Sequence, residues 1–76
     1  MTRAEKLERL QEIFRDVLDQ PGLRVTEDFS TTDCPVWDSV ATVQIVLAAE
    51  TTFGFRAPTL TVASLRNVRE LLDLLP

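Results

Sequence analysis

A chain of 76 residues forms one small domain, covering residues 1–76, and its composition of twelve acidic and eight basic side chains gives a net charge of −4. This acidic balance argues against nucleic-acid binding, because phosphates need a basic patch. Cys34 is the only cysteine and histidine is absent, which excludes an intramolecular disulfide and a Cys/His zinc site and favours a reducing compartment.

The first expected element is an amphipathic helix over residues 2–19. Thr2 and Glu5 have the spacing of a capping box, in which each residue bonds the backbone of the other. Apolar residues follow at steps of three and four, on one helical face; they are Leu7, Leu10, Ile13, Phe14, Val17 and Leu18. Pro21 and Gly22 then end the helix, since both residues break helical structure.

Residues 23–37 have no clean period and are rich in Thr, Ser, Asp and Pro. A connection of this length is uncommon in a compact domain and tends to be functional or disordered. Bulky side chains predict that this one is ordered and anchored to the core; these anchors are Val25, Phe29, Val36 and Trp37. We expect Cys34 to be a small, half-buried residue.

A second long helix is predicted over residues 39–53, which contain no Pro or Gly, and Gly54 closes it. The segment after Pro58 is too short for more than one helical turn. Asn67 and Glu70 again have capping-box spacing and open a last helix. Its apolar face consists of Val68, Leu71, Leu72 and Leu75. These elements predict an all-α fold, a small antiparallel four-helix bundle of three main helices and one short one.

The helix predicted over residues 39–53 has apolar side chains on two sides. At about 100° per residue, one stripe consists of Ile45, Val46, Ala49 and Phe53. The opposite stripe consists of Val40, Val43 and Leu47, flanked by Gln44 and Thr51. A bundle this small hardly encircles a helix, so we expect the second stripe to be exposed, where apolar residues often mark an interaction site. Burial on all sides is the alternative.

The absence of histidine also limits catalysis. A serine hydroxyl is a weak nucleophile unless a base takes its proton, usually His and sometimes Lys. The single lysine, Lys6, lies far along the chain from Ser39, so we expect no catalytic residue. A site of paired carboxylates would need a pocket that a chain of this length scarcely encloses. No run of about 18 apolar residues occurs and the charged start is unlike a signal peptide, which predicts a cytoplasmic protein without a membrane span.

The segment WDSVATVQIVLAAETTFGF (residues 37–55) resembles the acyl carrier and peptidyl carrier proteins. Their signature is Asp-Ser-Leu at the start of the second helix, then an apolar residue four positions after the Ser, and a Glu and a Phe near the helix end. The corresponding residues here are Asp38, Ser39, Val40, Val43, Glu50 and Phe53. The layout of the other helices agrees as well, so the resemblance covers nearly the whole chain.

The resemblance implies that Ser39 carries 4′-phosphopantetheine, transferred from coenzyme A by a separate phosphopantetheinyl transferase, and that this group holds an acyl or aminoacyl cargo as a thioester. The chain would be a stand-alone carrier and a substrate of enzymes, not an enzyme itself, and it needs no bound metal. Asp38 would support the site, either as a helix cap or by helping the transferase to position metal and hydroxyl.

The other expected partners are a loading enzyme and a downstream synthase or transferase. The loading enzyme would be an adenylating ligase or an acyltransferase, and the pathway one of fatty-acid, polyketide or nonribosomal-peptide-like biosynthesis. We expect a monomer whose docking residues are Val40, Val43, Gln44, Leu47 and Glu50.

The helix over residues 39–53 differs from that of carriers in general fatty-acid synthesis, which display several acids there. Glu50 is its only acid after Ser39, so electrostatic steering by this helix should be weak, which favours a specialised pathway. The segment TVQIVLAAETTF also resembles the D-alanyl carrier protein, so an amino-acid cargo stays open.

An alternative function is a non-catalytic helical module that binds a partner protein through Val40, Val43 and Leu47. It predicts that Ser39 is dispensable. The arginines of the second half form no compelling phosphate site in the sequence and are interpreted as surface residues; they are Arg56, Arg66 and Arg69.

Overall fold

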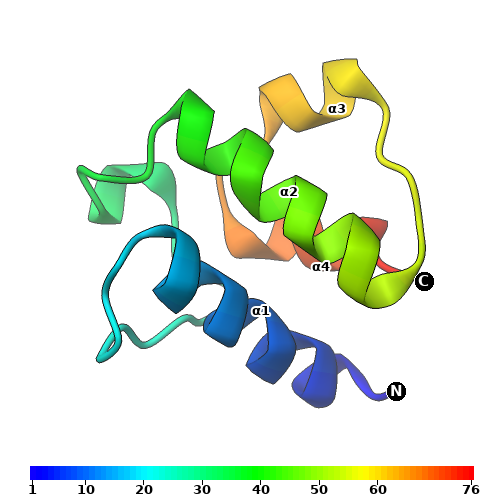
Figure 1. Cartoon of the computed structure of the whole chain (residues 1–76), viewed down its shortest axis with the longest axis horizontal. Coiled ribbons are helices and arrows are strands. Elements are labelled where there is room, and N and C mark those ends of the chain that lie inside the picture. Colours follow the sequence, from blue (N-terminus) through cyan, green and yellow to red (C-terminus); the bar gives the residue numbers. More distant parts are fainter.

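The computed structural model describes residues 1–76 and contains only helices. They are α1 (Arg3–Val17), the 3₁₀ turn η1 (Thr31–Asp33), α2 (Ser39–Phe53), α3 (Thr59–Ser64) and α4 (Val68–Leu74). α2 runs back along α1 and contacts both α1 and α3, while α4 packs against α1 (Figure 1). The predicted four-helix bundle with one short helix is therefore confirmed. None of these helices has the length and apolar character needed to cross a membrane.

Side chains at two helix starts explain where the helices begin. Thr2 and Glu5 form the predicted capping box, with Thr2 N donating to Glu5 Oε1 at 3.0 Å and Glu5 N donating to Thr2 Oγ1 at 3.1 Å. The bond from the Thr2 backbone lowers the pKa of the Glu5 carboxyl. At α4, Asn67 Oδ1 accepts from Glu70 N at 2.9 Å. The Glu70 carboxylate bonds the N–H of Arg66 instead of that of Asn67, so only half of the second capping box forms.

Two residues with positive φ mark helix ends. Gly54 closes α2 in the left-handed conformation, with φ at 71°, as its position in the sequence predicts. α1 ends at Val17, two residues before the predicted end at 19, and Asp19 leaves the helix with φ at 54°. An aspartate tolerates this conformation better than most residues with a side chain, so α1 stops before Pro21 is reached.

One core of 15 buried side chains fills the space between the helices. α1 supplies Leu10 and Phe14. The buried apolar residues of α2 and α4 are Ala41, Ile45, Val46, Ala49, Val68, Leu71 and Leu72. Three aromatic rings fix the long connection to this core: Trp37 meets Phe14 edge-on at 4.9 Å between centroids and stacks on Phe29 at 5.6 Å. Pairs of this kind contribute about 0.5–1.5 kcal/mol each beyond the area that they bury.

The long connection is ordered, as predicted, but one of its predicted anchors is wrong. Val25 and Trp37 are buried and Phe29 packs against the core, whereas Val36 is 48% exposed. The reason is a turn in which Trp37 N donates to the Cys34 carbonyl at 3.0 Å, so the residues between them lie at the exposed corner. Cys34 itself is fully buried rather than half-buried.

The same connection is tied to the segment that leads into α4. Backbone bonds join Thr31 N to Arg66 O at 3.0 Å and Val68 N to Phe29 O at 2.9 Å. These bonds lie either side of an isolated bridge between Ser30 and Asn67. As a result, residues 29–31 of the connection lie beside residues 66–68, which join α3 to α4.

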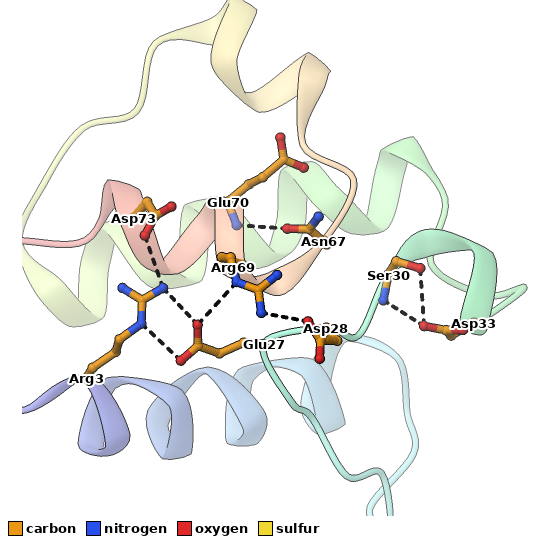
Figure 2. Close-up of polar contacts among 9 residues, drawn as sticks. All are labelled: Arg3, Glu27, Asp28, Ser30, Asp33, Asn67, Arg69, Glu70 and Asp73. Atoms are coloured by element: carbon orange, nitrogen blue, oxygen red, sulfur yellow. Dashed lines mark hydrogen bonds and ion pairs between the residues drawn. The ribbon is translucent and has the colours of Figure 1, made fainter.

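A cluster of charged side chains adds a second tie between α1, the connection and α4 (Figure 2). Arg3 pairs with Glu27 at 2.9 Å and with Asp73 at 3.1 Å. Arg69 pairs with Asp28 at 2.6 Å and lies 3.6 Å from Glu27. The hydrogen bonds from Arg3 lower the pKa of the Glu27 carboxyl. Arg69 is exposed, as the sequence predicts, and its charge is neutralised within this cluster.

Candidate functional site

Ser39 is the first residue of α2 and its side chain is exposed. Asp38 precedes it as the helix cap, with Oδ1 accepting from Ala41 N at 2.8 Å, and the Asp38 carbonyl accepts from Thr42 N at 3.0 Å. The backbone N–H groups of Ser39 and Val40 have no acceptor within the protein. An exposed hydroxyl beside free donors, at the positive end of a 15-residue helix, is suited to carrying a phosphate group.

A buried side-chain bond holds this helix start in place. Trp37 Nε1 donates to Thr42 Oγ1 at 2.9 Å, and that hydroxyl donates to the Asp38 carbonyl at 3.1 Å. Thr42 is the one buried polar residue of the chain, so this chain of bonds is shielded from water and is costly to leave incomplete. Trp37 therefore couples the aromatic core to the position of Ser39, which goes beyond its predicted role as an anchor.

A cavity of about 350 Å³ opens beside Ser39, between α2 and α3. Its walls mix apolar side chains with hydroxyls and two charged groups; the lining residues are Thr31, Trp37, Asp38, Ser39, Thr42, Val43, Thr59, Val62, Ala63, Leu65 and Arg66. Arg66 is exposed, as the sequence predicts, and it shares this cavity with Ser39. The cavity wall also includes Thr31, whose backbone N–H bonds the Arg66 carbonyl.

Residues 8–75 of the chain match the family described as "Phosphopantetheine attachment site". The chain belongs to this family of carrier proteins. It is 36% identical over 73 residues to the acyl carrier protein of Acidothermus cellulolyticus (strain ATCC 43068 / DSM 8971 / 11B), a match that spans 96% of this chain and 87% of that protein. Its fold is similar to the solution NMR structure of the holo acyl carrier protein from Geobacter metallireducens, with a TM-score of 0.80 and 29% identity over 91% of this chain and 79% of that one.

Membership of this family gives the carrier its general role. It bears covalently attached 4′-phosphopantetheine and is a substrate of modifying and biosynthetic enzymes, not a catalyst. The features at the start of α2 fit such a group: an exposed hydroxyl, two free backbone donors and a neighbouring cavity. His, Cys, Asp and Glu side chains form no cluster of three or more that could hold a metal ion.

The outer face of α2, defined by Val40, Val43 and Leu47, is exposed as the two-stripe pattern predicts. The three side chains are 64%, 48% and 57% exposed, and the neighbouring Gln44 is exposed as well. Glu50 differs from these four residues, because it is half-buried and its Oε2 accepts from the Ala57 N–H at 2.7 Å. Glu50 therefore holds the loop between α2 and α3, and its predicted part in docking stays a prediction.

Proposed function

We propose that this carrier bears 4′-phosphopantetheine on Ser39. The observation that supports the proposal is the difference in hydrogen bonding among the three serine hydroxyls of the chain. Ser30 Oγ bonds Asp33 and Thr32, and Ser64 Oγ donates to the Thr61 carbonyl, whereas Ser39 Oγ has no partner in the protein and stands at a helix start. Ser39 is thus the hydroxyl that a modifying enzyme reaches without first breaking a bond within the carrier.

The roles of the carrier's own residues follow from this geometry. Ser39 Oγ would form the new bond to phosphorus and lose its proton to a base on the transferase, while the pyrophosphate P–O bond of coenzyme A breaks and the nucleotide part leaves with the other phosphate. Asp38 uses Oδ1 to cap the helix, so its second carboxylate oxygen is free to help position the transferase's metal and the hydroxyl. Once attached, the group supplies a thiol that holds acyl or aminoacyl cargo as a thioester.

Partner enzymes would dock on the outer face of α2, next to Ser39. The proposed partners are a phosphopantetheinyl transferase, a loading enzyme (an adenylating ligase or an acyltransferase) and a downstream synthase or transferase. Glu50 is the only acid of α2 and one of its oxygens is engaged with Ala57, so contacts of Val40, Val43, Gln44 and Leu47 would dominate. Such binding depends weakly on salt, which favours partners of a specialised pathway over those that present strongly basic patches.

The free thiol of Cys34 is consistent with the reducing cytoplasm as the proposed compartment. The net charge of −4 supports protein partners over nucleic acid. We propose that the carrier acts as a monomer.

Mass spectrometry tests the attachment site. Incubation with coenzyme A, Mg²⁺ and a promiscuous phosphopantetheinyl transferase is expected to add about 340 Da, the mass of the covalently added group. Ser39→Ala should abolish this gain, while Ser64→Ala, which removes another exposed serine, should retain it. A gain that survives Ser39→Ala would overturn the proposal.

A second experiment separates the carrier from the alternative interaction module. Val43→Asp places a charge on the outer face of α2 and should slow loading of the holo-carrier by its partner about tenfold or more, as expected for an apolar contact of over 1 kcal/mol. Thr52→Asp is the matched control, because Thr52 is exposed on the same helix but lies about 100° farther round than Thr51, away from the stripe. If Ser39→Ala leaves all function intact while Val43→Asp removes partner binding, the chain acts as the module instead.

A further inference from the structure

Arg66 lies on the wall of the cavity that Ser39 also lines. We propose that Arg66 forms an anion subsite, which holds a non-bridging phosphodiester oxygen of the group on Ser39. The inference rests on the proposed attachment to Ser39 and adds a residue of this chain that restrains the group after its transfer.

The backbone of Arg66 is fixed on both sides. Its carbonyl accepts from Thr31 N at 3.0 Å, and its N–H donates to Glu70 Oε1 at 2.9 Å. The adjacent Leu65 is buried in the core. The side chain therefore starts from a position set by the long connection and by α4, beside the start of α2.

The guanidinium is oriented by two further bonds and still has free donors. Nη1 donates to the carbonyls of Ala63 at 3.2 Å and Leu65 at 3.0 Å, while Nε and Nη2 have no partner. No carboxylate forms an ion pair with Arg66, in contrast to Arg3 and Arg69, which each pair with two acids. The Nε and Nη2 protons form the fork that matches two oxygens of a phosphate group.

A phosphodiester is the anion that suits this position. It would be joined directly to Ser39, within the same cavity wall as Arg66, and the free N–H groups of Ser39 and Val40 would face it from the helix side. A carboxylate on the cargo would instead lie at the far end of the arm. The Asp38 carboxylate also lines the cavity and repels a phosphate, and the positive charge of Arg66 offsets this repulsion.

Arg66 also has a simpler structural explanation. Its bonds to the carbonyls of Ala63 and Leu65 cap the C-terminal end of α3 (Ser64 is its last residue). A capping role alone predicts that a substitution changes the apo and holo forms equally. An anion subsite predicts an additional change that only the holo form shows.

NMR spectroscopy of apo and holo forms separates these roles, with mass spectrometry first establishing that each sample carries the group. In the wild type, attachment should shift the Arg66 Nε–H signal and slow its exchange with water. In holo Arg66→Gln, the ³¹P signal should shift and its relaxation should report a more mobile phosphate. The population in which the phosphate is held at residue 66 should fall roughly two- to fivefold, the range expected for a partly exposed ion pair. Arg66→Lys, which keeps the charge but lacks the fork, should be intermediate.

Arg56→Gln is the matched control, since Arg56 is also exposed but lines a different cavity. The ³¹P signal of the holo Arg56→Gln variant should equal that of the wild type. A full mass gain with an unchanged Arg66 Nε–H signal, or with the same ³¹P signal in Arg66→Gln, overturns the inference and leaves the attachment to Ser39 standing. No mass gain overturns the attachment and the inference together. If Arg66→Gln does not fold, the wild-type apo and holo comparison decides alone.

Discussion

The inner and outer faces of α2 carry similar aliphatic side chains in opposite surroundings. Ile45 and Val46 are at most 3% exposed on the inner face, whereas Val40 and Leu47 are 64% and 57% exposed on the outer face. Burial of an aliphatic side chain contributes about 1.5–3 kcal/mol to folding, and the outer residues forgo most of this gain. A small carrier with a modest core thus keeps apolar surface uncovered next to Ser39, which is the surface that a partner enzyme would cover.

The largest expected effect tests the inner face. Ile45→Ala should destabilise the fold by about 2–5 kcal/mol, because it removes a buried side chain and leaves a cavity. Leu47→Ala, on the outer face, should stay within about 0.5 kcal/mol of the wild type. Urea unfolding followed by circular dichroism measures both, and equal losses would show that the two faces do not differ as their exposure indicates.

The stripes of α2 could be predicted from the sequence because a helix repeats its faces with a fixed period. The helical period over Ser39–Phe53 therefore assigns each side chain to a face before any tertiary contact is known. The irregular connection has no such period. Val36 and Trp37 are both bulky and apolar, and only the turn closed by the Cys34 carbonyl decides that Trp37 is buried and Val36 exposed.

Only part of the site could be predicted, because the sequence identifies neighbouring residues but not contacts across the fold. Asp38 and Ser39 are adjacent in sequence, so a cap and a hydroxyl could be recognised together, and the cap is confirmed. From the sequence, Thr42 is not singled out and Arg66 is interpreted only as a surface residue, because the contacts of both depend on the tertiary fold. Arg66 lines the cavity with Thr31, whose N–H bonds its carbonyl, and Thr42 is buried beneath the Trp37 indole. No sequence pattern predicts either contact, because both depend on the tertiary arrangement.

The next effect in size concerns the helix cap at the start of α2. Asp38→Ala removes the cap on Ala41 N and should cost about 0.5–2 kcal/mol of stability. Asp38→Asn keeps a good capping side chain without the charge, so it should fold with nearly wild-type stability. Comparing the rates of phosphopantetheine transfer to the two variants separates the roles of Asp38. If Asp38→Asn is modified as fast as the wild type, the carboxylate acts only as a cap.

The smallest effect concerns the charged cluster that ties α1 and α4 to the long connection (Figure 2). Hydrogen bonds from Arg3 hold the pKa of the Glu27 carboxyl below its ordinary value of 4.5. A carboxyl with a lowered pKa in the folded state stabilises the fold above its unfolded pKa, and this contribution is lost as the pH falls from 4.5 through the lowered value. The size should be small, because ion pairs exposed to solvent contribute little.

Glu27→Gln should therefore be slightly less stable than the wild type at pH 7, and the difference should vanish in acid. Urea unfolding at a series of pH values from 7 to about 2, a range that spans the titration of carboxyl groups, measures this difference. Some acid sensitivity should persist in Glu27→Gln, since the Glu5 carboxyl in the capping box also has a lowered pKa. Glu50 is the only acid of α2 and is bonded to the Ala57 N–H, so docking on the outer face should not follow this pH dependence. A constant difference between wild type and Glu27→Gln at every pH would show that the Glu27 charge does not stabilise the tie, and that its shape alone matters.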